Sequence, residues 1–423
     1  MEITRRYFLK SSGLSLFGLG CVPSFLRRTA FALEGPAAAK KKVLVALFMR
    51  GAADGLNIVV PYAENNYYQM RPTIAIPKPG KGDGGEGAID LNGFFGFHPR
   101  LAPLKPIFDA GHLAVIHAAG SPDSTRSHFD AQDYMETATP GNKSTQDGWL
   151  NRYLQRNVEV DPTPFRAVAL APALPVSLQG RAPALAFNDI RQFHLAMNPK
   201  NPAYPLVEGA FQSLYASTSD PLLSRTARET FEATKTLEGI QAQQYLQANG
   251  AEYPNGQAGQ HLKQVAQLIK SGVGLEIAFV DVGGWDHHVN EGGVQGQLGN
   301  LLGKFGGALA AFHQDLGDQM EDVVVLTMSE FGRTARENGN RGTDHGHANV
   351  MFVMGGAVKG GKVYGRWPGL RPDDLNEGRD LKLTTDFRDV FAEAVTRHLG
   401  ATHTGAMFPG FAVSPDRFRG FLG

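Results

Sequence analysis

The chain has 423 residues with 41 basic and 41 acidic side chains, so its formal net charge at pH 7 is zero. This balance argues against a nucleic-acid-binding surface. A single cysteine, Cys21, excludes a disulfide bond within the chain. Beyond residue 32, no apolar run is long enough to predict a transmembrane helix.

The first 32 residues predict an export signal rather than part of the fold. Arg5-Arg6 precedes Tyr7-Phe8-Leu9-Lys10, a pattern typical of twin-arginine signals. A weakly apolar stretch, Ser11 to Phe25, follows, and Ala30-Phe31-Ala32 forms a small-x-small cleavage site. Two alternatives remain open: an amphipathic N-terminal helix of the folded domain, and a lipid-anchored form attached through Cys21.

Cleavage after Ala32 would leave a mature chain that begins at Leu33 and carries 36 basic and 40 acidic residues, a net charge of −4. The expected partner during export is the twin-arginine translocase, and the expected location is the periplasm or another exported compartment. This pathway transports folded proteins, which favours a protein that takes up a cofactor or metal before export.

Five short apolar runs rich in β-branched residues predict buried strands of a parallel sheet. In chain order they are Val43–Met49, Leu113–Ala118, Glu276–Val282, Asp322–Met328 and Val350–Met354. Helical periodicity predicts helices over Gln297–Met320 and Phe387–Leu399, the second capped by Thr385 or Asp386. We expect one α/β domain over residues 33–423, with insertions at about 155–260.

Polar residues follow the first two predicted strands, and ligands of open parallel sheets bind beyond the carboxyl ends of strands. Asp54 lies in a glycine-rich turn after the first strand, as a ligand or a turn-forming residue. After the second strand, Ser127 is either a helix cap or a nucleophile, with Ser124 and Thr125 as competing hydroxyls. His128 is a candidate base, metal ligand or structural histidine.

The later predicted strands are flanked by carboxylates and imidazoles, which together suit a divalent metal such as Zn²⁺. Asp286 and His288 follow the third strand and lie two positions apart, so an extended loop places them on one side. Glu330 follows the fourth strand as a ligand, an ion-pair partner of Arg333 or, as we favour, an acceptor that orients a histidine. Before the fifth strand stand Asp344, His345 and His347.

These motifs together resemble an exported bacterial family, the domain-of-unknown-function family fifteen-oh-one, which is grouped with the alkaline phosphatase and sulfatase superfamily. The matching segments are Arg50 to Asn57, Ser127-His128-Phe129, Gly284-Trp285-Asp286-x-His288, Ser329 to Thr334 and Gly342 to Gly346. The resemblance implies an alkaline-phosphatase-like three-layer sandwich: a mostly parallel central sheet with helices on both faces.

The superfamily likeness also implies roles for individual residues. Its metallohydrolases carry an early Asp, a Ser or Thr nucleophile, an Asp and His pair, an Asp-His-Gly-like motif and a further His, in that order. On this pattern one metal would be held by Asp54, Asp344 and His345, and a second by Asp286, His288 and His347. Ser127 would attack the substrate, and Arg126 or Arg50 would hold an oxygen of the ester.

The resulting hypothesis is an exported hydrolase of phosphate or sulfate esters that uses one or two divalent ions, with Zn²⁺ favoured. The anionic ester would be its substrate. The alternative is an exported metal-binding or interaction protein that kept the fold without catalysis, because a fold does not determine its chemistry.

Overall fold

The computed structural model describes residues 41–81, 86–159, 162–193, 201–219, 221–242 and 244–423. The predicted export signal lies outside the described residues. Among the described residues, no helix combines the length and apolar character that crossing a membrane requires.

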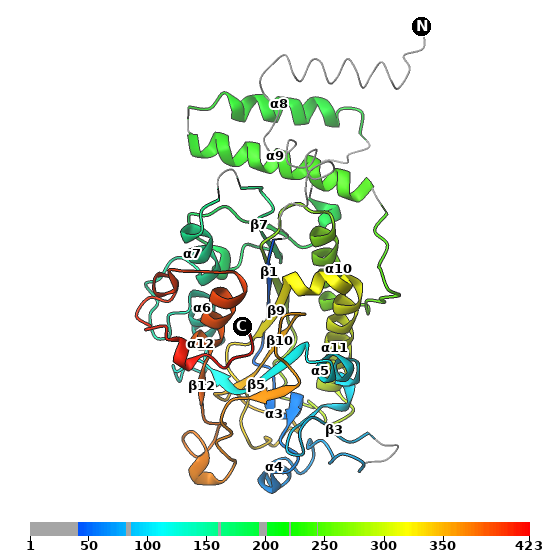
Figure 1. Cartoon of the computed structure of the whole chain (residues 1–423), viewed down its shortest axis with the longest axis vertical. Coiled ribbons are helices and arrows are strands. Elements are labelled where there is room, and N and C mark those ends of the chain that lie inside the picture. The colour runs from blue at the N-terminus through cyan, green and yellow to red at the C-terminus, as the bar shows by residue number, and fades with distance from the viewer. Residues whose placement is uncertain (1–40, 82–85, 160–161, 194–200, 220, 243) are drawn as a thin grey trace.

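A nine-stranded sheet forms the centre of the molecule (Figure 1). Its strands are β1 (Val43–Met49), β5 (Leu113–Gly120), β6 (Ala167–Leu170), β7 (Leu185–Phe187), β8 (Ile277–Val282), β9 (Val323–Met328), β10 (Asn349–Met354), β11 (Lys362–Tyr364) and β12 (Thr385–Asp386). The order across the sheet is β11-β5-β10-β9-β1-β8-β6-β7, and β12 pairs with β5. All five predicted strands are present, each within two residues of its expected bounds.

The direction of β10 differs from the prediction. Strand β10 pairs antiparallel with both β5 and β9, whereas every other pairing in this sheet is parallel. The prediction of a parallel fifth strand was therefore wrong, because burial on both faces gives the same apolar run in either direction. Its reversal brings the residues before β10 to the edge where the parallel strands end.

Helices cover both faces of the sheet, which confirms the predicted three-layer α/β class (Figure 1). One face packs against α5 (Lys105–Asp109), α10 (Gln257–Lys270) and α11 (Gln297–Leu316). The other packs against α6 (His128–Thr137), α7 (Trp149–Arg156) and α12 (Phe387–Glu393). Alternate residues of β1 enter the two cores, with Val45 on one side and Ala46 on the other.

Both predicted helices are present with altered ends. The helix from Gln297 stops at Leu316, where Gly317 has a φ of +52°, and a 3₁₀ helix covers Gly317–Asp322. The helix from Phe387 is α-helical to Glu393 and continues as a π-helical turn over Ala394–His398. Its N-cap is Asp386, whose carboxylate accepts from the amide of Arg388.

The remaining elements lie around this centre. Residues 155–260, which we expect from the sequence to be insertions, contribute β6 and β7 to the central sheet. The helices α8 (Tyr204–Ala216) and α9 (Pro221–Ala242) follow these two strands. A second sheet has the order β2 (Val59–Val60), β4 (Gly96–Phe97) and β3 (Ile89–Asp90). Helices α3 (Gly55–Ile58) and α4 (Asn65–Met70) lie at the end opposite α8 and α9 (Figure 1).

Candidate metal centre

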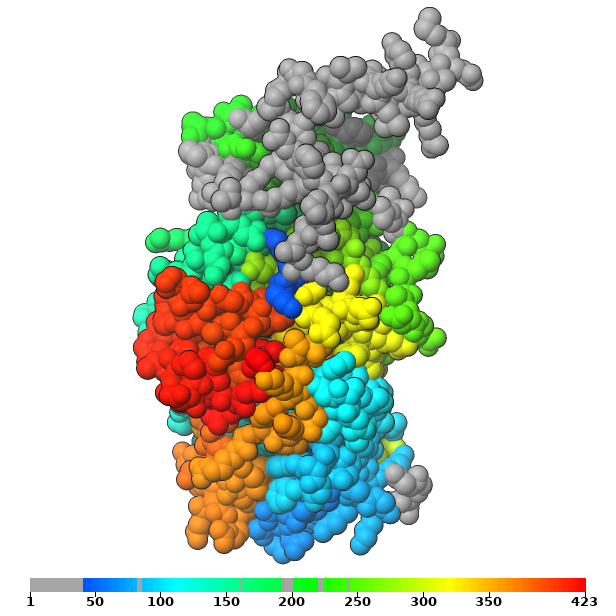
Figure 2. Space-filling model, viewed as in Figure 1, coloured from blue at the N-terminus to red at the C-terminus, as the bar shows by residue number. Residues whose placement is uncertain are grey.

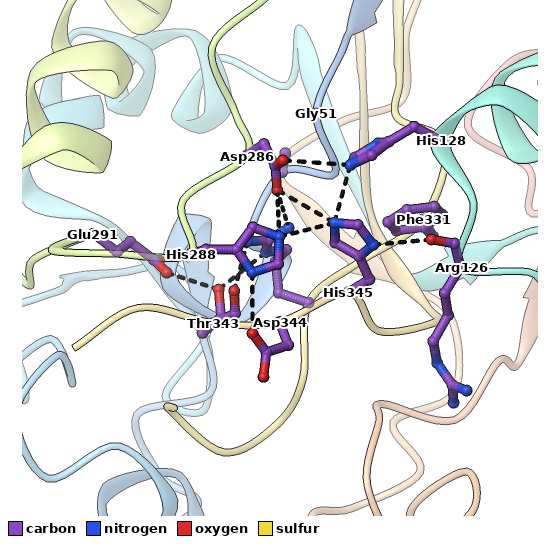
Figure 3. A network of polar contacts seen from close by, with 12 residues as sticks. Gly51, Arg126, His128, Asp286, His288, Glu291, Phe331, Thr343, Asp344 and His345 are labelled. Carbon is purple, nitrogen blue, oxygen red and sulfur yellow. Dashed lines mark hydrogen bonds and ion pairs between the residues drawn. The ribbon is translucent and has the colours of Figure 1, made fainter. Parts of the chain in front are cut away.

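Four side chains that can bind a metal meet at the edge where the parallel strands end (Figure 3). His128 is the first residue of α6, and Asp286 and His288 lie in the loop after β8. His345 lies in the loop that leads into β10. The antiparallel direction of β10 is what brings His345 to the other three residues.

The donor atoms of His128, Asp286 and His345 all lie within 4.8 Å of one another, as a single metal ion requires, and His288 adjoins this group through His345 and Asp286. The Nε2 atom of His345 lies 3.0 Å from Nε2 of His128 and 2.9 Å from Nε2 of His288. The Asp286 carboxylate lies 3.0 Å from Nε2 of His288, 3.4 Å from Nε2 of His345 and 3.5 Å from Nε2 of His128. Tetrahedral bonds of about 2.0–2.1 Å place ligand atoms roughly 3.3 Å apart, which matches this spacing.

The opposite ring nitrogens fix which atom of each imidazole carries the proton. Nδ1 of His128 contacts Glu330 at 2.8 Å, Nδ1 of His288 contacts Asp344 at 3.0 Å, and Nδ1 of His345 contacts the carbonyl of Arg126 at 2.9 Å. Carbonyl and carboxylate oxygens only accept, so each Nδ1 donates. The Nε2 lone pair of His345 therefore faces those of His128 and His288 beside a carboxylate, an arrangement that a cation stabilises.

The carboxylates behind the histidines are held in their ionised form. Burial would raise the pKa of Glu330, but hydrogen bonds from His128 and Gln132 lower it below its usual value. For Asp344, hydrogen bonds from Asn338 and His288 outweigh burial and also lower the pKa. The hydrogen bond to Glu330 in turn raises the pKa of His128. Each carboxylate thus holds the Nδ1 proton of its histidine and orients the ring.

Arg333 supplies the positive charge next to Asp286. Its Nη1 donates to Oδ1 of Asp286 at 2.7 Å, and although burial opposes it, this contact lowers the pKa of that carboxyl. With neutral imidazoles, the carboxylates of Asp286, Glu330 and Asp344 and the guanidinium of Arg333 sum to two negative charges. A divalent cation would neutralise this sum.

Glycines let three loops approach closely around the centre. A Cβ atom on Gly346 would lie 2.3 Å from the backbone carbon of Arg333, and one on Gly342 would lie 2.5 Å from the backbone of His288. Gly51 has a φ of +119°, and a Cβ there would lie 2.7 Å from the amide nitrogen of Asp286. The loops that carry Asp286, His288 and His345 can be this close only because these positions have no side chain.

The structure does not bring Asp54 to the four donors. Asp54 is buried and forms an ion pair with the guanidinium of Arg71, which is also fully buried. Burial and the neighbouring charge of Asp54 raise the pKa of Glu291 well above its usual value. Thr343 donates to Glu291 at 2.8 Å and accepts from Arg333 at 3.1 Å, so this buried cluster supports the centre from behind.

Two other predicted ligands lie outside the donor set. Asp344 reaches the centre only through Nδ1 of His288, rather than facing the Nε2 atoms. His347 lies near the charged groups of Asp380, Arg126 and Glu377, and burial lowers its pKa. The structure thus gathers Asp286, His288 and His345 from the predicted set and adds His128, for which the sequence left three roles open.

The predicted substrate-binding arginines are occupied by acidic partners. Arg126 binds Glu377 and Asp380 at 2.7 Å, and its side chain points away from the histidines (Figure 3). Arg50 binds Glu136 at 2.8 Å and Asp281 at 2.6 Å.

Ser127 has the contacts of a helix cap. Its Oγ accepts from the amide of Asp130 at 3.5 Å, and its own amide donates to Thr125 at 3.3 Å. Ser127 directly precedes His128, so its backbone lies one residue from a metal-binding side chain.

Sequence reasoning missed two partners of the centre. An ion pair of Arg333 with Glu330 is one of the alternatives that the sequence leaves open, but the structure pairs Arg333 with Asp286. Glu291 follows His288 by three residues in a polar loop, and nothing in its sequence surroundings indicates complete burial. The glycines at 342 and 346 were the available signal, because they mark a close approach of backbones around the Asp-His motif.

Solved structures that resemble this chain do so weakly, as two of them show. A comparison with curated proteins finds no match. The lipoteichoic acid synthase LtaP from Listeria monocytogenes matches at a TM-score of 0.31 and 11% identity, over 75% of this chain and 66% of that one. Alkaline phosphatase from the Antarctic bacterium TAB5 matches at a TM-score of 0.30 and 11% identity, over 75% of this chain and 93% of that one.

The family assignment is firmer, because the model of one family matches residues 114–408. This range includes His128, Asp286, His288 and His345, and also Glu330 and Asp344 behind them. The chain belongs to the family described as "Protein of unknown function (DUF1501)".

Proposed function

We propose that the protein is an exported, metal-dependent hydrolase of phosphate or sulfate esters. The observation that carries this proposal is the convergence of three imidazole lone pairs and one carboxylate at a solvent-accessible point. The side chains of Asp286 and His288 are 43% and 40% exposed, so a ligand can reach them. The strand-end position is also where α/β sheets bind their ligands.

The donor set favours zinc. Three nitrogen ligands disfavour Mg²⁺ and Ca²⁺, which prefer oxygen, whereas imidazole suits Zn²⁺ and its neighbours in the transition series. A zinc ion held by His128, Asp286, His288 and His345 would act as a Lewis acid on the ester. Among the described residues, the group of side chains whose donor atoms lie close enough together for a metal is His128, Asp286 and His345, with His288 beside it, so we propose one ion per chain.

The chain's own residues would hold this centre in place while the ester reacts. Glu330, Asp344 and the carbonyl of Arg126 accept the Nδ1 protons, so the Nε2 lone pairs of the neutral rings are left for the metal, and Arg333 balances the charge of Asp286. In the net reaction, an oxygen of water bonds to phosphorus or sulfur, the bond to the alcohol oxygen breaks, and the alcohol leaves with a proton.

A second function is favoured by the number of donors. Four protein ligands complete a tetrahedral site, whereas catalytic zinc sites usually keep one position open. Asp286 decides between the two functions: bound to the metal it closes the site, and held by Arg333 it leaves a position free. A closed site would make the protein a non-catalytic metal-binding protein.

Turnover of para-nitrophenyl phosphate and para-nitrophenyl sulfate by zinc-loaded protein tests the proposal. We expect the parent protein to hydrolyse at least one of these esters and a chelator to abolish this activity. The His345→Ala variant should neither bind zinc nor hydrolyse the ester. His403→Ala is the matched control, because His403 is an exposed histidine outside the centre. Zinc binding without turnover of either ester would favour the non-catalytic function.

Ser127→Ala tests whether the attacking oxygen comes from the chain. If Ser127 is the nucleophile, its oxygen bonds to phosphorus or sulfur, the bond to the alcohol oxygen breaks, and the alcohol leaves with a proton while the hydroxyl proton of Ser127 goes to solvent. Water then hydrolyses the covalent serine ester. The variant should then keep its zinc and lose hydrolysis, with about 1 kcal/mol of stability lost with the helix cap. Retained hydrolysis would assign the attack to water or to another hydroxyl, such as that of Ser124 or Thr125.

We also propose export through the twin-arginine translocase, on the sequence of residues 1–32. Replacing Arg5 and Arg6 with Lys should keep the protein in the cytoplasm, and N-terminal sequencing of the exported form should begin at Leu33. A mature form that begins at a lipid-modified Cys21 would contradict this proposal.

A further inference from the structure

A pocket of about 290 Å³ lies beside the metal centre. Asp344 and Asn338 are in its wall, and both contact His288: the carboxylate of Asp344 meets Nδ1, and Asn338 donates to the carbonyl at 2.9 Å. The volume lies near the lower end of small-molecule sites, which span roughly 300–1,000 Å³. The pocket thus adjoins the centre on the Nδ1 side of His288, through Asp344 and Asn338.

Three separate segments build the walls. Met70 ends α4, residues 334–344 belong to the loop between β9 and β10, and residues 372–379 follow β11. Figure 2 shows the early and late segments, coloured blue and orange, packed side by side at one end of the molecule. Met70, Pro372 and Leu375 supply apolar surface, and Arg336 and Arg379 supply positive charge.

Most charged groups of the pocket already have partners. Glu337 accepts from the amides of Thr73 and Ile74 at 2.9 and 3.1 Å. Arg379 donates to the carbonyl of His345 at 2.8 Å, so it supports the loop that carries this histidine.

Arg336 differs from these charged residues in having no partner for its side chain within the described part of the chain. Its side chain is exposed and lines the pocket, and within the described part of the chain its guanidinium has neither a hydrogen-bond nor an ion-pair partner. An unpaired, exposed guanidinium in the wall of a partly apolar pocket suits a carboxylate, sulfate or phosphate group of a ligand.

We propose that this pocket binds the alcohol portion of the ester, and that this portion is small, partly apolar and carries a second negative charge that Arg336 recognises. The inference rests on the proposed function, because it places the reacting ester group at the metal centre. It narrows the substrate class to esters with two anionic groups separated by a small apolar body.

The test compares two non-hydrolysable probes, phenylphosphonate and para-carboxyphenylphosphonate, by titration calorimetry on zinc-loaded full-length protein. The second probe should bind about fivefold more tightly, as expected for one partly exposed ion pair. Arg336→Gln should lose this preference and keep its affinity for phenylphosphonate, which shows that the metal centre is intact. Arg181→Gln, a change of an exposed arginine outside the pocket, should keep the preference.

Each other result contradicts a stated part of the argument. Equal binding of the two probes to the parent protein, or an unchanged preference in Arg336→Gln, would contradict the proposed role of the pocket. Neither result would contradict the proposed metal-dependent hydrolysis. If neither probe binds to zinc-loaded protein, the proposed function fails and the pocket assignment fails with it.

Discussion

Glu330 determines whether the Nε2 atom of His128 is available to bind a metal. Its buried carboxylate accepts from Nδ1 of His128, from the side chain of Gln132 at 2.8 Å and from the amide of Gly51 at 2.9 Å. These donors hold the carboxylate in one orientation, so the imidazole proton stays on Nδ1. A metal ligand whose second nitrogen is held in this way binds more tightly.

Glu330→Gln should weaken zinc binding by about 10- to 100-fold, the usual effect of removing such a support. The affinity can be measured by competition with a chromogenic chelator. Glu238→Gln, an exposed change on α9, is the control and should bind zinc as the parent does. An unchanged affinity in Glu330→Gln would mean that His128 does not bind the metal.

Glu291 predicts a pH dependence of stability. Burial and the neighbouring charge of Asp54 raise its pKa in the folded protein well above the unfolded value of 4.5. The folded state therefore binds a proton that the unfolded state has lost, and its stability falls as pH rises between these two pKa values. Within that window the slope from this group is about 1.4 kcal/mol per pH unit.

Glu291→Gln should remove this slope, because an amide imitates the protonated carboxyl and does not titrate. Urea unfolding of metal-free protein between about pH 5 and pH 8 would measure the difference between variant and parent. Parallel pH profiles for the two proteins would show that Glu291 is ionised in the folded state.

At the scale of elements, the sequence predicted the five strands of the sheet centre because each is a short apolar run buried on both faces. It could not predict the direction of β10, since an antiparallel strand buried on both faces has the same composition. β11 and β12 are short edge segments with polar residues, and their pairing with β5 depends on contacts distant in sequence.

The candidate site was predictable to a similar extent. The Asp-His motifs indicated Asp286, His288 and His345, since polar residues at strand ends commonly bind ligands. Asp54 has the same local pattern, but the buried guanidinium of Arg71 makes it an ion-pair partner. That contact joins residues 17 positions apart through the fold, and the sequence alone does not specify it.

The loop before β10 gives a prediction about Gly346. Gly346→Ala should displace the loop that carries His345, because the new Cβ would lie 2.3 Å from the backbone of Arg333. We expect a loss of about 1–3 kcal/mol of stability, typical of overpacking, together with weaker zinc binding. Gly339→Ala in the same loop is the control, because nothing lies within 4 Å of its Cβ position. Comparable zinc affinity and melting temperature in both variants would contradict this account.

At the scale of the whole molecule, the metal should add a link between three segments that already meet through hydrogen bonds such as those of Arg333 with Asp286 and of His128 with Glu330. Removing zinc with a chelator should lower the thermal midpoint, because zinc at a thousandfold excess over its Kd stabilises the folded state by about 4 kcal/mol. The effect should shrink near about pH 5.5, where protons compete for metal-free imidazoles whose ordinary pKa is about 6.5. His128 should be protonated first, because Glu330 raises its pKa, whereas burial lowers that of His345.

Thermal unfolding followed by circular dichroism, with and without chelator at the two pH values, would measure this change. His345→Ala should show no response to chelator at either pH. A parent protein that melts at the same temperature with and without chelator would argue that the four side chains do not bind a metal in solution.

The wide separation of the donors along the chain has a consequence for biosynthesis. His128 and His345 are 217 positions apart, and β10, which positions His345, follows it in the sequence. The centre therefore cannot assemble on a nascent chain until most of the polypeptide has left the ribosome and the sheet has closed around β10. Metal selection is thus a late event, and a protein that folds before export would take its ion from the cytoplasmic pool.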